Sequence, residues 1–230
     1  MAKKEGNIKN IAVILGAGAG IRFGERTPKQ FLEVNHKMMI EHTIEVFQTH
    51  PKIDEIMVAL PENYLHLSDH LSKYSKITAF VKGGSERYHS TLHVLKTLEK
   101  REEVNLFFHD AVRPFVSHQI INNVIQALEK HKAVVVATPS TYTILEINEN
   151  ETITRIPARE TIYHAQTPQA FRLSIIQKAF ALALQDAHFC PTDDSSVVFH
   201  YLPDEHIFIV RGEETNRKIT FEGDVGLFNH

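Results

Sequence analysis

The sequence predicts an α/β protein in three layers, with a mostly parallel sheet that helices cover on both faces. Short β-branched runs alternate with longer amphipathic stretches, an order typical of strand–helix units in a parallel sheet. The apolar runs are nearly continuous, as in strands buried on both faces. The 230 residues are 43% hydrophobic and include only 10 Gly and 9 Pro, so the chain can bury a sizeable core. Because no repeat or flexible linker interrupts it, we expect one domain over residues 1–230.

Strands are expected where β-branched and other apolar residues gather, at residues 8–15, 55–60, 77–81, 104–108, 133–137 and 206–210. Between them, amphipathic stretches predict helices at residues 38–49, 63–73, 88–100 and 117–130. Ser117 is the expected N-cap of the last helix, since its hydroxyl can accept a hydrogen bond from the first turn. The apolar pattern of residues 173–184 predicts a further helix that faces the core rather than a membrane.

Residues 139–166 break this order and predict a β-hairpin arm. Thr, Ile and charged residues alternate on both sides of Asn148, Glu149 and Asn150, which favour a turn. A hairpin with so few apolar neighbours is marginally stable alone, so we expect the arm to pack against another surface. A second subunit and the chain's own domain are about equally good candidates for that surface.

Composition and charge exclude several classes of protein. The net charge of −3 gives no basic surface for sequence-independent binding of nucleic acid. The single cysteine, Cys190, excludes a disulfide scaffold and a cysteine-rich zinc module, and it fits a reducing cytoplasm. The N-terminus is not expected to be a secretion signal, because glycines and Arg22 interrupt its apolar run. No run approaches the ~18 consecutive apolar residues that a membrane span needs.

A glycine-rich loop follows the first expected strand, comprising Leu15, Gly16, Ala17, Gly18, Ala19 and Gly20. Backbone N–H groups in such a loop can point at a phosphate because no Cβ obstructs them. The spacing fits neither G-x-G-x-x-G nor the P-loop pattern, so the loop alone could be only a tight turn. Arg22 and Lys29 lie close behind. They either serve an anionic transition state or are ordinary surface charges.

Two more strand ends carry groups that could bind a ligand. Gly83 and Gly84 follow the third expected strand, and Asp110 follows the fourth. In an open α/β sheet these ends line the edge where ligands bind. The Asp110 carboxylate could hold a divalent cation or pair with Arg113, and both readings stay open.

Six motifs in this order resemble the cytidylyltransferases that act on polyol phosphates, namely the 2-C-methyl-D-erythritol 4-phosphate and D-ribitol 5-phosphate enzymes. The motifs are Gly16-Ala-Gly-x-Gly-x-Arg22, Pro28-Lys-Gln30, Gly83-Gly-x-x-Arg87-x-x-Ser90, His109-Asp-Ala-x-Arg-Pro114, Thr167-Pro-Gln169 and Asn216-x-Lys-Ile-Thr220. The likeness covers essentially the whole chain. It implies a Rossmann-like nucleotidyltransferase sheet with a protruding β-hairpin arm.

The resemblance also implies a role for each matching position. The loop of residues 15–20 would wrap the CTP triphosphate, and the catalytic cations would be Arg22, Lys29 and Lys218. The cytidine would be framed by Gly83, Gly84, Ser85, Arg87 and Ser90, and Asp110 would hold Mg²⁺. The acceptor polyol phosphate would meet Thr143, Arg159, Thr167 and Lys218. Arg159 would come from the arm of a partner subunit, which predicts a homodimer formed through residues 139–166.

Three positions depart from the family pattern. Tyr142 stands in place of Asp before the arm threonine, Phe23 in place of Met, and Asp194 in place of a common Glu. Val112, Phe115 and residues 163–169 look more like the ribitol enzymes, so we favour D-ribitol 5-phosphate over 2-C-methyl-D-erythritol 4-phosphate as the acceptor. The chain stops where the family continues a helix. This end is either short or continued by a further domain, such as the reductase of some ribitol enzymes.

Three features of the sequence also have other interpretations. The glycine loop could bind a dinucleotide in an oxidoreductase, although its spacing and its cations fit that function poorly. The chain could also be a catalytically inactive relative that only binds CTP. His66 and His70 have a spacing that could bind zinc, but no third ligand lies nearby in the sequence, so we expect a solvated helix face.

Overall fold

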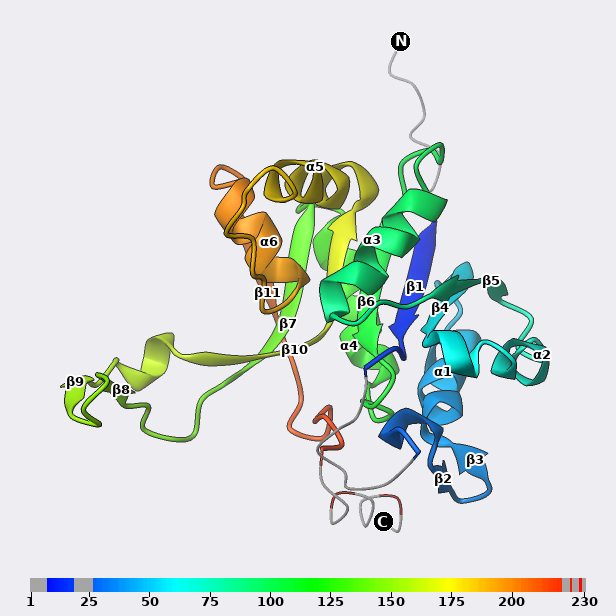
Figure 1. The fold of residues 1–230 in the computed structure, drawn as a ribbon. Helices are drawn as coiled ribbons and strands as arrows, with labels where there is room; N and C mark the ends of the chain where they lie inside the picture. The colour runs from blue at the N-terminus through cyan, green and yellow to red at the C-terminus, as the bar shows by residue number, and fades with distance from the viewer. Residues whose placement is uncertain (1–7, 19–26, 221–223, 225–227, 229–230) are drawn as a thin grey trace.

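A computed structural model describes residues 8–18, 27–220, 224 and 228 of the chain. Its main sheet has seven strands in the order β11-β7-β10-β6-β1-β4-β5 (Figure 1). They are β1 (Asn10–Leu15), β4 (Glu55–Leu60), β5 (Ile77–Lys82), β6 (Asn105–Asp110), β7 (Ala133–Pro139), β10 (Tyr163–Arg172) and β11 (Ile207–Arg211). All run in one direction except β10, which is antiparallel to both β6 and β7. The six strands expected from the sequence are confirmed.

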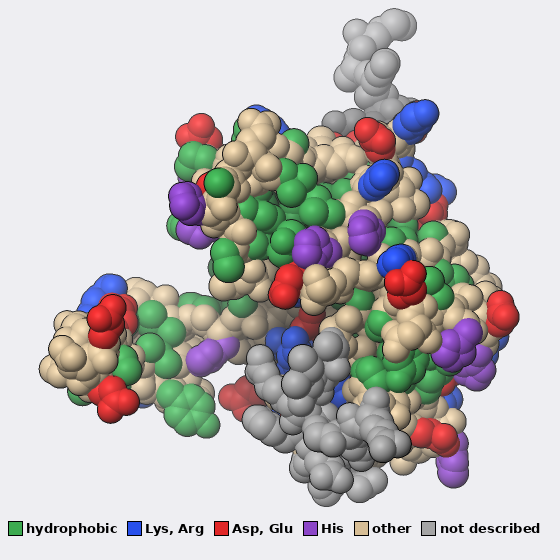
Figure 2. All heavy atoms as spheres, viewed as in Figure 1, with side chains coloured by type: hydrophobic (Ala, Val, Ile, Leu, Met, Phe, Trp, Pro, Cys, Tyr) green, Lys and Arg blue, Asp and Glu red, His purple; other side chains and the backbone are tan. Residues whose placement is uncertain are grey.

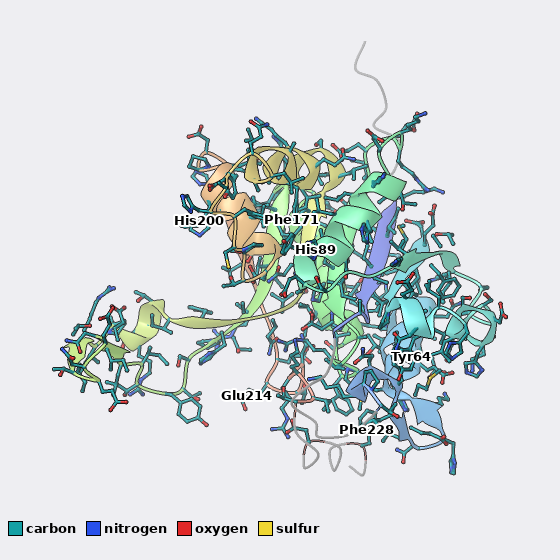
Figure 3. The ribbon with its side chains drawn as sticks, in the orientation of Figure 1. Tyr64, His89, Phe171, His200, Glu214 and Phe228 are labelled. Carbon is teal, nitrogen blue, oxygen red and sulfur yellow. The ribbon has the colours of Figure 1, made fainter. Side chains whose placement is uncertain are left out.

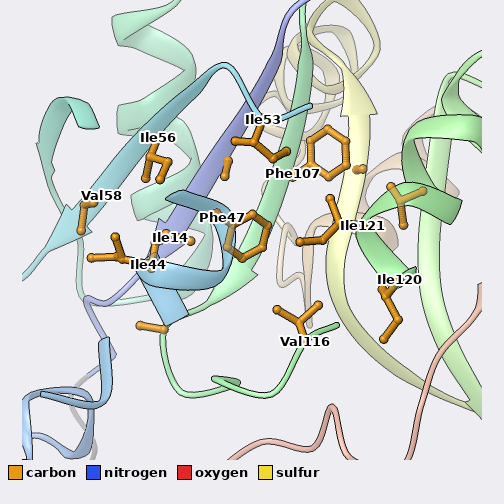
Figure 4. Packing of buried hydrophobic residues seen from close by; sticks show 14 of the residues in the cluster. Ile14, Ile44, Phe47, Ile53, Ile56, Val58, Phe107, Val116, Ile120 and Ile121 are labelled. Atoms are coloured by element: carbon orange, nitrogen blue, oxygen red, sulfur yellow. The ribbon is translucent and has the colours of Figure 1, made fainter. Parts of the chain in front are cut away.

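Helices cover both faces of this sheet, so the three-layer α/β fold is confirmed. The helices are α1 (Met39–Thr49), α2 (Leu67–Leu71), α3 (Arg87–Thr97), α4 (His118–Leu128), α5 (Leu173–Ala183) and α6 (Asp194–Tyr201). The first core cluster joins α1, α2 and α4 to the sheet, and the second joins α3, α5 and α6. Ile14 belongs to the first cluster and Val13 to the second, because successive side chains of a strand point to opposite faces. Figure 4 shows the first cluster, where Phe47 of α1 and Ile121 of α4 pack over Phe107.

Strand β10 has no counterpart among the expected elements, because its sequence is unusual for a buried strand. It contains Pro168, which lies within the register shift between Ala165 and Gln169, where the ladder is interrupted. Its buried side-chain amides form hydrogen bonds with other segments of the chain. Gln166 Nε2 donates to the Glu213 carbonyl at 2.8 Å, and Gln169 Nε2 donates to Asp193 Oδ2 at 2.6 Å. Burial of this strand therefore depends on partners that are distant in sequence.

The expected helices differ from the observed ones mainly at one place. Residues 63–73 form the 3-10 turn η3 (Glu62–Tyr64) followed by the short α2, rather than one helix. The cap at Ser117 is confirmed, since its hydroxyl oxygen accepts from the Ile120 N–H at 3.1 Å. Helix α6 has no counterpart among the expected elements. A small hairpin, β2 (Glu33–Val34) and β3 (Lys37–Met38), follows the 3-10 turn η2 (Lys29–Phe31).

The arm predicted at residues 139–166 is a hairpin that projects away from the sheet (Figure 1). Its strands are β8 (Glu146–Ile147) and β9 (Ile153–Arg155), followed by the 3-10 turn η4 (Arg159–Thr161). Asn148 Oδ1 closes the turn by accepting from the N–H groups of Asn150 and Thr152, both at 3.0 Å. Several large apolar side chains of the arm are exposed, and Figure 2 shows them among its charged ones. No helix of the described part is long and apolar enough to cross a membrane.

Candidate active site

A cavity of about 510 Å³ lies at the carboxyl ends of β1, β5 and β6. Its volume suits a small-molecule site. The residues that line it are Leu15, Ala17, Gly18, Lys29, Gln30, Gly84, Ser85, Glu86, Arg87, Ser90, Asp110, Val112, Lys218 and Thr220. Most of the residues expected to bind the nucleotide are therefore brought together. Ala19, Gly20, Arg22 and Phe23 lie outside the described residues.

Two glycine turns form one wall of the cavity and touch each other. A Cβ on Gly83 would lie 2.0 Å from the Cβ of Ala17, and a Cβ on Gly84 would lie 2.1 Å from that of His89. Gly83 also donates its N–H to the Leu60 carbonyl at 2.7 Å. Glycine is needed at position 83 because the two loops approach closely there, and at position 84 because His89 of the following helix leaves no room for a Cβ, whatever ligand the loops bind.

The second turn leads directly into α3, which begins at Arg87. Ser90 is 2% exposed, and its hydroxyl oxygen accepts from the Gly84 N–H at 3.2 Å. His89, labelled in Figure 3, places Nδ1 3.2 Å from the Glu86 N–H and 3.2 Å from the Ser85 hydroxyl. The ledge predicted at Gly83 and Gly84 is therefore fixed by side chains of the helix that follows it.

Asp110 is the last residue of β6, and its carboxylate pairs with three cationic side chains. Its Oδ2 lies 3.0 Å from Lys218 Nζ and 3.5 Å from Arg113 Nε, and its Oδ1 lies 3.6 Å from Arg87 Nε. Burial alone would raise the pKa of this carboxyl, but the three cations hold the pKa of Asp110 well below its usual range. The carboxylate is therefore ionised at neutral pH. The ion pair with Arg113 that the sequence left open is present, and Lys218 and Arg87 join it.

A buried hydrogen-bond chain fixes Asp110 from behind. The Asp110 N–H donates to Thr167 Oγ1 at 3.2 Å, and that oxygen lies 3.0 Å from His109 Nδ1. His109 Nε2 lies 3.0 Å from the Arg113 carbonyl, which can only accept, so we assign the ring proton to Nε2. Burial lowers the pKa of His109 to about 4, which keeps the ring neutral. Thr167 is 4% exposed and supports the strand end, and its contact with the acceptor stays a prediction.

Lys218 is tied to the same strand end by Asn216. Asn216 is fully buried and its Nδ2 donates to the Thr167 carbonyl at 2.8 Å, while its own carbonyl accepts from Arg113 Nη1 at 2.8 Å. The segment after β11 is thereby held beside Asp110. Asn216 belongs to one of the sequence motifs, but the sequence does not reveal its role, because the hydrogen bonds that define the role span about 50 and 100 residues.

The departure at Asp194 has a structural role. Asp194 is fully buried, and its carboxylate accepts from Arg87 Nη1 at 2.5 Å and from the Thr91 hydroxyl at 2.8 Å. Arg87 therefore bridges Asp194 and Asp110, and the shorter Asp side chain still reaches it. Asp194 acts on the cavity through Arg87 rather than by lining it.

The acceptor residues of the arm lie apart from this cavity. Arg159 Nη2 donates to Thr143 Oγ1 at 3.2 Å, both side chains are exposed, and neither lines the cavity. Tyr142, the second departure, is 73% exposed on the same arm. Within one chain, the structure thus separates the arm residues from the nucleotide-binding residues.

The described residues hold no group of three His, Cys, Asp or Glu side chains that could bind a metal on its own. His70, one of the two histidines with zinc-like spacing, places Nε2 3.1 Å from Glu41 Oε1. That contact is an ordinary polar pair between α2 and α1. Asp110 belongs to no such group among the described residues, so a cation on it would take most of its ligands from a bound substrate or water.

A mostly parallel sheet with two abutting glycine turns and a cation-lined cavity at its strand ends defines a nucleotide-binding α/β protein. The model of one family, described as IspD, 2-C-methyl-D-erythritol 4-phosphate cytidylyltransferase, matches residues 10–229. The chain therefore belongs to the IspD family of cytidylyltransferases. This membership confirms the expected family and the expected class of enzyme, a CTP-dependent nucleotidyltransferase, and it argues against an oxidoreductase.

Individual relatives carry two different names. The chain is 41% identical to a Haemophilus influenzae protein named bifunctional ribulose 5-phosphate reductase/CDP-ribitol pyrophosphorylase, over 92% of this chain but only 46% of that protein. It is 37% identical to the 2-C-methyl-D-erythritol 4-phosphate cytidylyltransferase of Bifidobacterium longum, over 97% of this chain and 80% of that enzyme. A solved 4-diphosphocytidyl-2C-methyl-D-erythritol synthase from Anaerococcus prevotii superposes with a TM-score of 0.85 at 33% identity, covering 96% of this chain and 97% of that one.

Proposed function

We propose that this chain transfers CMP from CTP to D-ribitol 5-phosphate, giving CDP-ribitol and pyrophosphate. The single observation that carries the transfer is the cavity beside two glycine turns, which is lined by Lys29, Arg87 and Lys218 and in which Arg87 and Lys218 pair with Asp110. That arrangement suits a triphosphate, because backbone N–H groups and cations stabilise phosphate oxygens and the charge that develops during transfer. The acceptor assignment is supported by the 41% identity to the Haemophilus influenzae CDP-ribitol pyrophosphorylase.

The reaction needs positioning more than proton transfer. An oxygen of the acceptor phosphate attacks the α-phosphorus of CTP, and the bond from that phosphorus to the oxygen bridging to the β-phosphorus breaks as pyrophosphate leaves. The attacking oxygen is already anionic, so no general base is required. Lys29, Lys218 and Arg22 would neutralise charge on the α- and β-phosphates, and Ser90 and Arg87 would hold the cytidine side of the cavity.

Mg²⁺ fits the Asp110 carboxylate. Mg²⁺ commonly binds one or two protein carboxylates together with substrate phosphates and water, and Asp110 is an ionised carboxylate on the cavity wall. The ion would supply charge neutralisation to the triphosphate when bound. In the protein itself, Lys218, Arg87 and Arg113 keep Asp110 ionised, while Thr167 and His109 hold the backbone of Asp110 in place at the site.

A homodimer would bring the arm to the site. Arg159 and Thr143 are exposed on a projecting arm that carries apolar side chains at its surface, among them Leu145 and Ile156. Exposed apolar groups of this kind mark a surface that another protein covers. We propose that each arm packs against the partner subunit, with Arg159 binding the acceptor phosphate there.

The second candidate acceptor is 2-C-methyl-D-erythritol 4-phosphate, which is favoured by the family description and by the Bifidobacterium longum relative. Pyrophosphate release from CTP, measured with each acceptor in turn and with Mg²⁺ present, decides between them. We expect the higher kcat/KM with D-ribitol 5-phosphate. A higher value with the methylerythritol substrate would reverse the assignment, and CTP binding without turnover on either would indicate an inactive relative. We also propose a cytoplasmic location, which the single cysteine supports.

A further inference from the structure

Gln30 is a buried amide at the cavity wall whose contacts belong to the glycine loop. It follows Lys29 in η2 and is 3% exposed. Its Nε2 lies 2.7 Å from the Gly16 carbonyl oxygen and 2.8 Å from the Gly18 carbonyl oxygen. A carboxamide NH₂ has two hydrogens, so both of its donors are committed to the protein rather than to a ligand.

These two bonds fix the orientation of the loop backbone. In a trans peptide the C=O and the following N–H point in opposite directions. Holding the Gly16 carbonyl against Gln30 therefore also sets the direction of the Ala17 N–H. Glycine residues would otherwise give the loop many accessible conformations, and a loop that must be ordered when the ligand arrives binds more weakly than an ordered one.

The anchor itself is rigid, because η2 is packed and hydrogen-bonded on both sides of Gln30. Phe31 is 7% exposed and stacks on Tyr64, labelled in Figure 3, with ring centroids 4.3 Å apart. The Phe31 N–H donates to the Pro28 carbonyl at 2.9 Å. The glycine loop of residues 16–18 is also held from its other side, because Ala17 packs so closely against Gly83 that a Cβ on Gly83 would not fit.

We propose that Gln30 is a positioning residue that holds residues 16–18 in the conformation that binds the CTP triphosphate. It acts through the two carbonyls and not through the substrate. Because Lys29 and Gln30 are adjacent in one 3-10 turn, the same turn that presents the catalytic lysine also sets the loop beside it. This inference rests on the proposed function for its ligand, while the hydrogen bonds themselves do not.

Two substitutions test the inference against a matched control. Gln30→Met keeps the length of the side chain and removes both donors, whereas Gln30→Glu places a carboxylate oxygen against the two carbonyls. The control is Asn105→Leu at the opposite end of β6, where Asn105 is 6% exposed and its Nδ2 donates to Asn10 Oδ1 at 2.8 Å. This control also loses a buried amide hydrogen bond, but far from the glycine loop.

The first measurement is the split between kinetic constants. We expect Gln30→Met to raise the KM for CTP by roughly 10- to 100-fold, the scale for losing two hydrogen bonds, and Gln30→Glu to raise it further. The KM for the acceptor stays within about twofold, and Asn105→Leu leaves both constants unchanged. A merely structural defect would lower the amount of folded enzyme, and so the apparent kcat, without changing the KM for CTP. An unchanged KM for CTP in both Gln30 variants would overturn the proposal.

The second measurement is amide hydrogen exchange of the ligand-free protein across residues 15–18. We expect faster exchange there in Gln30→Met than in the wild type and in Asn105→Leu. Unchanged exchange would show that the amide does not hold the loop, and would overturn the inference. If the wild type released no pyrophosphate with any acceptor, the proposed function would fail, and the exchange result would still decide whether Gln30 positions the loop.

Discussion

The cavity and the arm differ in how firmly their polar side chains are held. In the cavity, each polar group is fixed by others. Asp110 has three cationic neighbours and a buried support through Thr167, and Gln30 binds the glycine loop. On the arm, Arg159 bonds to Thr143, and both are exposed. The cavity is preorganised within one chain, whereas Arg159 and Thr143 of the arm are exposed to solvent in the single chain.

This difference implies a division of labour. Electrostatic stabilisation of a transition state requires groups that do not have to reorganise during the reaction, and the cavity provides them. Binding of an acceptor tolerates a contact that is completed on assembly. Substitutions of the cavity cations that would neutralise phosphate charge should therefore lower kcat, and substitutions on the arm should change acceptor KM and assembly.

The largest effect is expected at Lys29, on the cavity side. Lys29→Ala should lower kcat by about 10²–10³-fold, the scale for losing one group that stabilises the transition state. Steady-state pyrophosphate release measures it. The control is Lys96→Ala on the exposed face of α3, which should keep the wild-type kcat. Near wild-type turnover of the Lys29→Ala enzyme would show that Lys29 does not stabilise the transition state.

A smaller and different effect is expected at Arg159, on the arm. Arg159→Ala should raise the KM for the acceptor by roughly 10- to 100-fold, as for the loss of a hydrogen bond between charged groups, with the KM for CTP unchanged. Arg155→Ala is the matched control, because Arg155 is an exposed arginine of the same arm that pairs with Glu146 at 3.1 Å. Equal effects of the two substitutions would mean that Arg159 has no special role.

The preorganised cavity should also have a signature in pH-dependent stability. The pKa of His109 is lowered by burial to about 4, so the unfolded chain binds a proton below about pH 6.5 that the folded chain does not bind. Stability contributed by the neutral ring is complete above that pH and falls as the pH drops from 6.5 towards 4. Between pH 7.5 and pH 5 this loss is about 2 kcal/mol. Urea unfolding at the two pH values measures the free energy of unfolding, which should fall by about 2 kcal/mol less in His109→Gln than in the wild type. An identical fall in both proteins would contradict a neutral, buried His109.

The smallest effect on folding is expected at the apolar surface of the arm. Ile147 and Ile153 are 58% and 51% exposed, so replacing either with Asp should change the free energy of unfolding of one chain by less than about 0.5 kcal/mol. The same substitutions should dissociate the proposed dimer, which sedimentation velocity would detect. Monomers with wild-type secondary structure are the expected result, and unchanged sedimentation would contradict a dimer contact at these residues.

The two regions also differ in how far the sequence predicts them. The six parallel strands and the arm could be predicted, because apolar runs and alternating patterns are local signals. Strand β10 could not, since Pro168 and two glutamines argue against a buried strand until Glu213 and Asp193 are seen to satisfy the amides. The family motifs predicted that Lys29, Arg87, Asp110 and Lys218 belong to one site, and all four line the cavity. The motifs did not reveal the supports from Gln30, Asn216 and Asp194, which arise from contacts between separate segments.

The relation between cavity and arm is tested most directly by mixing two impaired proteins at an acceptor concentration far below the KM of the Arg159→Ala variant. Arg159→Ala subunits retain Lys29, and Lys29→Ala subunits retain Arg159, so a mixed dimer has one site that holds both residues. After subunit exchange at equal concentrations, half of the dimers are mixed, and we expect about a quarter of the wild-type activity per subunit. No recovery, with exchange confirmed by mass spectrometry, would contradict a site shared between the cavity of one chain and the arm of another.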